Sequence, residues 1–182
     1  MKLLVATVFG VLAASSVFAQ SSPEIDKALQ PAPANLREGA TVIKWKSDFT
    51  YDTLKKGTNR LVCYDRSGLP QQPAISMECT SLSNLDRAAQ NMKFEVAGGT
   101  DKAKTQALLD AAEKDGTRAK PEFGSVWYHV MGADKDHLRT HMTIAVPMAT
   151  TQSTGIPDNN RQGGVWIMNA GTTTAHLMVP GE

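Results

Sequence analysis

Apolar and polar residues alternate in several short stretches of this chain, and a longer helical pattern separates the first of them from the rest. Near position 40, apolar Ile43 and Trp45 flank polar Lys44, and Leu61 to Tyr64 form a second apolar run after the turn-rich residues 55–59. Period-two alternation with β-branched and aromatic residues predicts strands. We expect an antiparallel hairpin whose second strand is 61–64.

The middle third of the chain predicts two amphipathic helices. In the first, apolar residues recur at steps of three and four: Leu82, Leu85, Ala89 and Met92. We expect the Gly98-Gly99 pair to end this helix and Thr100 to cap the next one. The apolar stripe of the second helix is Ala103, Ala107, Leu108, Ala111 and Ala112. Gly116 stands where a C-terminal cap belongs.

The last third returns to strand patterns, in "SVWYHVMGAD", "THMTIAVPMA", "GGVWIMNAG" and "AHLMVP". Strands, two helices and strands again, without regular β-α-β alternation, predict an α+β fold. We expect an antiparallel β-sheet with the two amphipathic helices packed on one face. Residues 40–182 are expected to form one domain, a length that supports a proper core.

The N-terminus has the layout of a secretory signal peptide over residues 1–19. Lys2 precedes an apolar run from Leu3 to Ala14, and small residues follow up to a cleavage site after Ala19. The run is too short for a membrane anchor, and no later stretch is long enough to span a bilayer. Residues 20–39 are expected to form an N-terminal arm with a short helix that starts at Pro23, because Pro is favoured in the first helical turn.

Charge argues against several classes of partner. The chain has 19 Lys and Arg against 18 Asp and Glu, and the expected signal peptide contains one of the lysines, so the mature chain is formally neutral. Proteins that bind nucleic acid or anionic membranes need a basic face. We therefore expect neither nucleic acid nor a membrane as a partner, but an unidentified small molecule or an envelope protein.

The two cysteines, Cys63 and Cys79, are predicted to form one disulfide bond. An even pair in an exported chain is typical of a structural disulfide, whereas redox or metal pairs are usually closer in sequence. The intervening loop contains two prolines and a glycine, so its ends can meet.

A His-x-Met triplet occurs twice, at His129/Met131 and His176/Met178. Side chains two apart in a strand share a face, so two neighbouring strands could present imidazole and thioether groups together. Such soft ligands select Cu(I), which makes copper a candidate cofactor. The alternative, that these are ordinary strand residues that fill a core, is the interpretation we prefer.

A further group of ionisable residues occurs in "DKDHLRTHM". His137 and His141 are four apart, and Asp136 lies beside them. This group could belong to a hydrolase site assembled in space, although the zincin pattern is absent because Leu138 stands where a Glu is required. A solvated turn is the simpler interpretation. No nucleophile elbow and no phosphate-binding Gly-rich loop is present, so we predict no catalytic residues.

Three stretches, "KKGTNRLVCYDR", "GSVWYHVMGADKDHLRTHMTIAVP" and "STGIPDNNRQGGVWIMNAGTTTAHLMVP", resemble a group of uncharacterised exported bacterial proteins. The resemblance covers about residues 40–180 and implies export and kinship, but no activity. The sequence thus favours an exported, periplasmic or secreted, non-catalytic binding or interaction module of the cell envelope. The alternatives are a periplasmic copper-binding protein and a hydrolase.

Overall fold

The computed structural model describes residues 22–180. The expected signal peptide lies outside these residues. Within them, eight strands form one sheet in the order β2-β1-β3-β4-β5-β6-β8-β7. The strands are β1 (Thr41–Trp45), β2 (Tyr51–Lys55), β3 (Leu61–Asp65), β4 (Ile75–Ser81), β5 (Val126–Gly132), β6 (Leu138–Ala145), β7 (Trp166–Met168) and β8 (His176–Pro180). The helices are α1 (Pro23–Ala28), α2 (Ala34–Arg37), η1 (Leu82–Asn84), α3 (Leu85–Gly98), α4 (Lys102–Lys114), α5 (Thr151–Thr154) and η2 (Asn160–Gln162). The α+β prediction is confirmed.

The hairpin prediction for the first strands is wrong. β1 turns back at residues 46–50 and pairs antiparallel with β2, whereas β3 pairs parallel with β1. The turn is local, because Asp48 accepts hydrogen bonds from the backbone and hydroxyl of Thr50, and Phe49 adopts a positive φ of 66°. These hydrogen bonds between Asp48 and Thr50 reverse the chain at residues 46–50. The predicted turn was the glycine-containing stretch at residues 55–59, which lies later in the chain.

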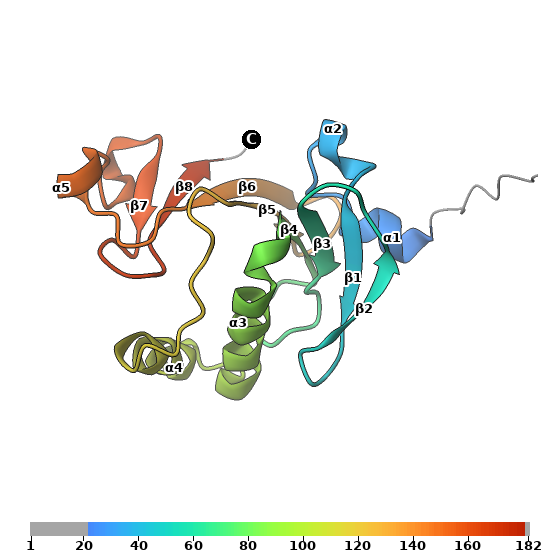
Figure 1. The fold of residues 1–182 in the computed structure, drawn as a ribbon, viewed down its shortest axis with the longest axis horizontal. Helices are drawn as coiled ribbons and strands as arrows, with labels where there is room; N and C mark the ends of the chain where they lie inside the picture. Colours follow the sequence, from blue (N-terminus) through green and yellow to red (C-terminus); the bar gives the residue numbers. More distant parts are fainter. Residues whose placement is uncertain (1–21, 181–182) are drawn as a thin grey trace, which may run out of the picture.

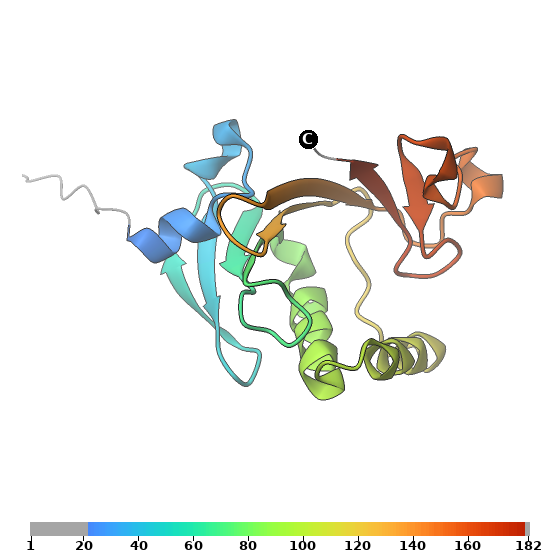
Figure 2. The ribbon, with the colours of Figure 1, turned by 180° about the vertical axis from the view of Figure 1, so that it is seen from behind.

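The sheet buries apolar side chains on both faces. On one face, Ala28, Leu29 and Ala32 of the N-terminal segment pack with the strand residues Val42 and Cys63. The opposite face buries Ile43, Val62 and Tyr64 of the strands with Leu85, Ala88 and Trp127. Figures 1 and 2 show α3 and α4 together on one side of the sheet and α1 on the other. The short helix predicted at Pro23 is present, capped by Ser22, and it contributes to the core.

Helix α3 ends as the sequence predicts, with Gly99 at a positive φ of 63° as its C-cap. Leu85 and Met92 are buried, but Leu82 is exposed because it belongs to the 3-10 turn before the helix. The buried face includes Ala88 instead. The apolar stripe that α3 packs against the sheet is therefore narrower than the sequence pattern predicts.

Helix α4 differs more from its predicted packing. Asp101, rather than Thr100, caps it through hydrogen bonds from the amides of Ala103 and Lys104. Of the five apolar residues in the predicted stripe, only Ala112 is buried. The helix packs against α3 and stands away from the sheet (Figure 1). This position leaves room for a cavity beneath it.

The approach of α4 to α3 depends on one glycine. A Cβ atom built on Gly98 would lie 1.8 Å from the hydroxyl oxygen of Thr105. Thr105 is buried, and it accepts a hydrogen bond of 2.6 Å from the Gln71 amide.

No helix among residues 22–180 has the length and apolar character needed to cross a membrane.

Candidate functional site

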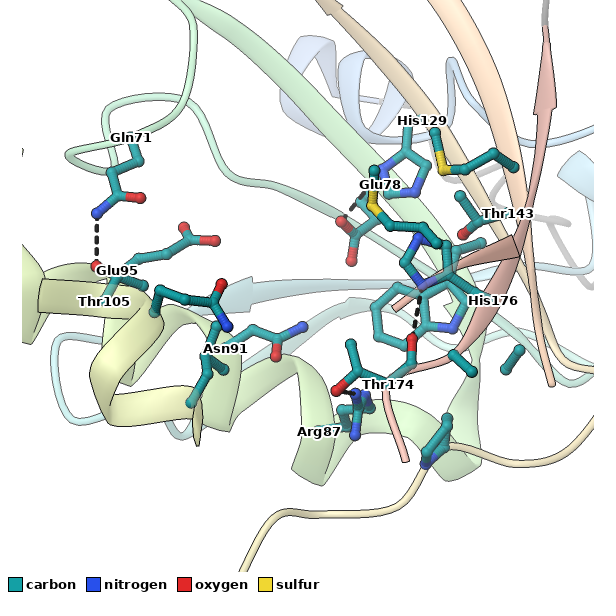
Figure 3. A pocket seen from close by; sticks show the side chains of 18 of the residues that line it. Gln71, Glu78, Arg87, Asn91, Glu95, Thr105, His129, Thr143, Thr174 and His176 are labelled. Atoms are coloured by element: carbon teal, nitrogen blue, oxygen red, sulfur yellow. Dashed lines mark hydrogen bonds and ion pairs between the residues drawn. The ribbon is translucent and has the colours of Figure 1, made fainter. Parts of the chain in front are cut away.

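A cavity of about 570 Å³ lies between the sheet and helices α3 and α4 (Figure 3). Its lining follows the periodicity of each element. Helix α3 contributes Arg87, Asn91 and Glu95 at steps of four, and α4 contributes Lys102, Thr105, Gln106 and Leu109 at steps of three and four. The strands contribute alternate residues, which are Glu78 from β4, Trp127 and His129 from β5, His141, Thr143 and Ala145 from β6, Met168 from β7, and His176 and Met178 from β8. The cavity is thus enclosed by polar helix faces and one face of the sheet.

Four ionisable side chains lie in one row across neighbouring strands. The strand register places Tyr64 opposite Glu78, Glu78 opposite His129, and His129 opposite His141. Directly opposite residues in antiparallel strands have Cβ atoms about 5 Å apart, so each side chain contacts the next. The row leads from the buried core at Tyr64 to the cavity.

Glu78 is the centre of a buried hydrogen-bond network. The Tyr64 hydroxyl donates to Glu78 Oε1, and Arg66 Nη1 donates to Oε2 at 2.7 Å. Arg66 Nη2 also donates to Glu95 Oε1 at 2.5 Å. Burial would raise the pKa of Glu78, but Arg66, His129 and Tyr64 outweigh it and hold that pKa well below its ordinary value. Glu78 is therefore an anion, and Arg66 is shared between two carboxylates.

His129 is oriented by this carboxylate. Its Nδ1 lies 3.4 Å from Glu78 Oε2, and its ring stacks on that of His141 with 4.3 Å between centroids and 11° between planes. Burial, followed by the neighbouring His129, lowers the pKa of His141 to about 4. At neutral pH His141 is uncharged, which lets the two rings stack without repulsion between two cations.

His176, on β8, is oriented by a hydrogen bond to the backbone. Its Nδ1 lies 2.7 Å from the backbone oxygen of Thr174, and a carbonyl oxygen only accepts, so Nδ1 carries the hydrogen. Burial lowers the pKa of His176 despite this hydrogen bond. The neutral ring therefore has its acceptor at Nε2.

Two further cations in the lining have only neutral partners. Arg87 and Arg118 are each 5% exposed. Arg87 donates to the backbone oxygen of Ala119 and, at 2.9 Å, to the Thr174 hydroxyl (Figure 3). Arg118 donates to the side-chain oxygens of Gln90 and Asn91. Within residues 22–180 neither guanidinium forms an ion pair closer than 4.0 Å.

The structure brings most of the residues of the copper hypothesis to this cavity. His129, His176 and Met178 line it, together with Met168, whereas Met131 is outside the lining. No group of three or more His, Cys, Asp or Glu among the described residues 22–180 has an arrangement suited to a metal ion. Copper binding therefore stays a prediction that rests on histidine and thioether ligands.

The other sequence-predicted residues are placed as follows. Cys63 and Cys79 form the predicted disulfide between β3 and β4, where they are directly opposite each other. His137 lies in the exposed turn between β5 and β6, hydrogen-bonded to Asp134, while His141 lines the cavity. The two histidines of the hydrolase hypothesis therefore do not share this cavity.

Glu78 and the arginines of the cavity were not predicted from the sequence. A signal was present for one wall, because Arg87, Asn91 and Glu95 form a polar stripe at steps of four beside the apolar stripe of the same helix. Arg118 gave no such signal, since it lies in the irregular segment between α4 and β5. Its position depends on how the chain returns to the sheet.

The proposed kinship with exported bacterial proteins rests on the three stretches quoted above. Those stretches include the β5–β6 hairpin and β8, which supply the histidines of the cavity. Comparison of the whole chain with protein-family models, with curated proteins and with solved structures finds no match.

Proposed function

We propose that this protein is an exported, non-catalytic binding protein of the cell envelope that holds a small polar molecule in the cavity between the sheet and helices α3 and α4. The observation that carries the proposal is the cavity itself. Its volume of about 570 Å³ is within the range of small-molecule sites, roughly 300–1,000 Å³. Polar groups converge on it from six elements, which are β4, β5, β6, β8, α3 and α4, and from the segments before β4, β5 and β8.

The residues around the cavity favour a preformed site. Glu78, Arg66 and Tyr64 hold one another in a buried network, and His129 is fixed against that network. Polar groups held in this way contribute specificity because a ligand does not need to order them. The Cys63–Cys79 bond supports export, since disulfides persist in oxidising compartments.

A thermal-shift screen with a blocked-cavity variant tests the proposal. Sugars, amino acids, nucleotides, organic acids and inorganic anions are each added at about 1 mM. A ligand with a Kd of about 10 μM would stabilise the native state by about 2.7 kcal/mol at that concentration. For a domain of this size this corresponds to a rise in Tm of roughly 5–10 °C.

The blocked variant is Gln106→Trp, which places a large side chain at an exposed position of α4 that lines the cavity. Gln162→Trp is the matched control, because Gln162 is also exposed and does not line the cavity. A ligand of the cavity raises the Tm of the wild type and of the control, and not that of Gln106→Trp. A screen in which no compound class distinguishes the two variants contradicts the proposal.

A second candidate, storage or transfer of cuprous ion, is favoured by one observation. His176 and Met178 line the cavity from β8, and Met168 is the register partner of His176 on β7. Imidazole and thioether ligands of this kind select Cu(I). Anaerobic Cu(I) should then raise the Tm, and Met178→Ala should abolish the rise while Met131→Ala, outside the lining, should retain it. No Cu(I)-dependent rise in the wild type would rule this candidate out.

A further inference from the structure

The charge of the cavity lining is positive. Four cationic side chains and two carboxylates line it, so apart from the histidines it has a formal charge of +2. The two carboxylates, Glu78 and Glu95, both bind Arg66. The excess positive charge therefore belongs to the other cations: Arg87, Arg118 and the exposed Lys102.

Arg87 and Arg118 are buried charges that form no ion pair within residues 22–180. A buried charge is costly unless an opposite charge or several hydrogen bonds compensate it. These two have neutral acceptors, and burial together with the charge of Arg87 lowers the pKa of Arg118 to about 10. Glu113 acts on both at longer range, but its carboxylate is occupied by the amide and hydroxyl of Thr173. The repulsion between the two guanidiniums is thus only partly offset.

Hydrogen-bond donors of Arg118 and Asn91, at the end of the cavity formed by Arg87 and Arg118, also lack acceptors within residues 22–180. Arg118 Nε is buried and has no acceptor among the described residues. The Asn91 oxygen accepts from Arg118, so the donor half of this amide is the half that can serve a ligand. Unused donors next to positive charge that is only partly offset favour an acceptor that carries negative charge.

We propose that Arg87 and Arg118 bind the acidic group, a carboxylate or a phosphate, of the small molecule held in the cavity. This inference rests on the proposed function and names the chemical class of its ligand. The guanidinium fork suits both groups, because each offers oxygens at the spacing of two parallel N–H donors. Asn91 would donate a further hydrogen bond to the same group. Arg66 Nε also lacks an acceptor among the described residues, but two carboxylates already compensate the charge of Arg66, so Arg66 is not part of this site.

The experiment is calorimetric titration of the full mature chain with two probes, succinate and inorganic phosphate, at constant ionic strength. The two probes separate a carboxylate site from a phosphate site. Arg118→Gln and Arg87→Gln remove one charge each, and Arg60→Gln is the matched control because Arg60 is a surface arginine outside the cavity. We expect at least one probe to bind, and each cavity variant to weaken it at least tenfold, about 1.4 kcal/mol. Arg60→Gln should leave the affinity unchanged.

A second comparison leaves the protein intact, in case a cavity variant does not fold. Succinamide has the size of succinate without its charge, and it should bind the wild type at least tenfold more weakly. Equal affinity for succinamide and succinate, or unchanged affinity in folded Arg118→Gln, overturns the inference.

The inference and the proposed function fail in different ways. If a neutral or cationic compound binds in a manner blocked by Gln106→Trp while neither anion binds, the cavity is a binding site and the arginine assignment is wrong. If no compound binds, both are wrong.

Discussion

Replacement of Glu78 by Gln tests the buried network that positions His129. Gln has nearly the same shape and still accepts the Tyr64 hydrogen bond, but it removes the negative charge that Arg66 and His129 face. Breaking a buried ion pair costs about 3–5 kcal/mol because it leaves a charge uncompensated. Arg66 retains Glu95 as a partner at 2.5 Å, so we expect the lower end, about 3 kcal/mol.

The matched control is Asp52→Asn. Asp52 forms an ion pair with Lys46 at 2.7 Å, and these side chains are 61% and 47% exposed. An exposed pair contributes little to stability, so the same change of carboxylate to amide should cost little there. The contrast between the two variants isolates the effect of burial.

The assay is equilibrium unfolding in urea, followed by tryptophan fluorescence and by circular dichroism. Coincident transitions from the two probes justify a two-state free energy of unfolding. Glu78→Gln should have a lower midpoint than Asp52→Asn with a similar slope. If Glu78→Gln loses less than about 1 kcal/mol, Glu78 does not hold this network together.

The remaining predictions concern acid, a helix contact and the disulfide. The pKa of His141 is about 4 in the folded chain and about 6.5 when unfolded, so the unfolded chain takes up the proton first and stability falls as pH decreases through this window. In His141→Gln the urea midpoint should change less between those two pH values than it does in the wild type. A pH profile identical to that of the wild type would refute this. Gly98→Ala should cost about 1–3 kcal/mol through its clash with the Thr105 hydroxyl, and Thr105→Ala in the same chain should recover part of the loss; additive costs would contradict the contact. Replacing Cys63 and Cys79 by Ala should cost about 3 kcal/mol, and wild type unfolded in reductant should match the variant.

The sequence was sufficient where structure is decided locally. The alternation around Trp127 and His129 predicted β5, the Gly98-Gly99 pair predicted the end of α3, and the cysteine pair predicted the disulfide. These features depend on neighbouring residues or on the redox compartment. They do not require knowledge of which strands meet.

The features that were missed depend on long-range pairing. Nothing local indicates that β3 lies parallel to β1, since this follows from an early turn at Asp48. The row from Tyr64 to His141 exists only because β3, β4, β5 and β6 are neighbours in register. The predicted stripe of α4 was wrong because the helix stands off the sheet, so Ala103, Ala107 and Ala111 are exposed and only Ala112 is buried. Each error concerns which element packs on which.

The two His-x-Met triplets illustrate the same limit. Their spacing correctly places His129 and Met131 in one strand and His176 and Met178 in another. The strand order then separates those strands by β6, which adds His141 to the cavity. Sequence spacing therefore identified strand residues of the cavity, but not its cationic end, which α3 and the segment after α4 supply.

The NMR signals of the arginine Nε–H groups, recorded during titration with succinate and with phosphate, test most directly whether the two buried arginines bind an acidic ligand. The signals of Arg118 and Arg87 should move and saturate with at least one of these anions, because Arg118 Nε gains an acceptor that none of residues 22–180 provides. The Arg60 signal, at the surface, should respond only to ionic strength. If Arg118 and Arg87 follow Arg60 with both anions, the two buried arginines do not bind an acidic ligand.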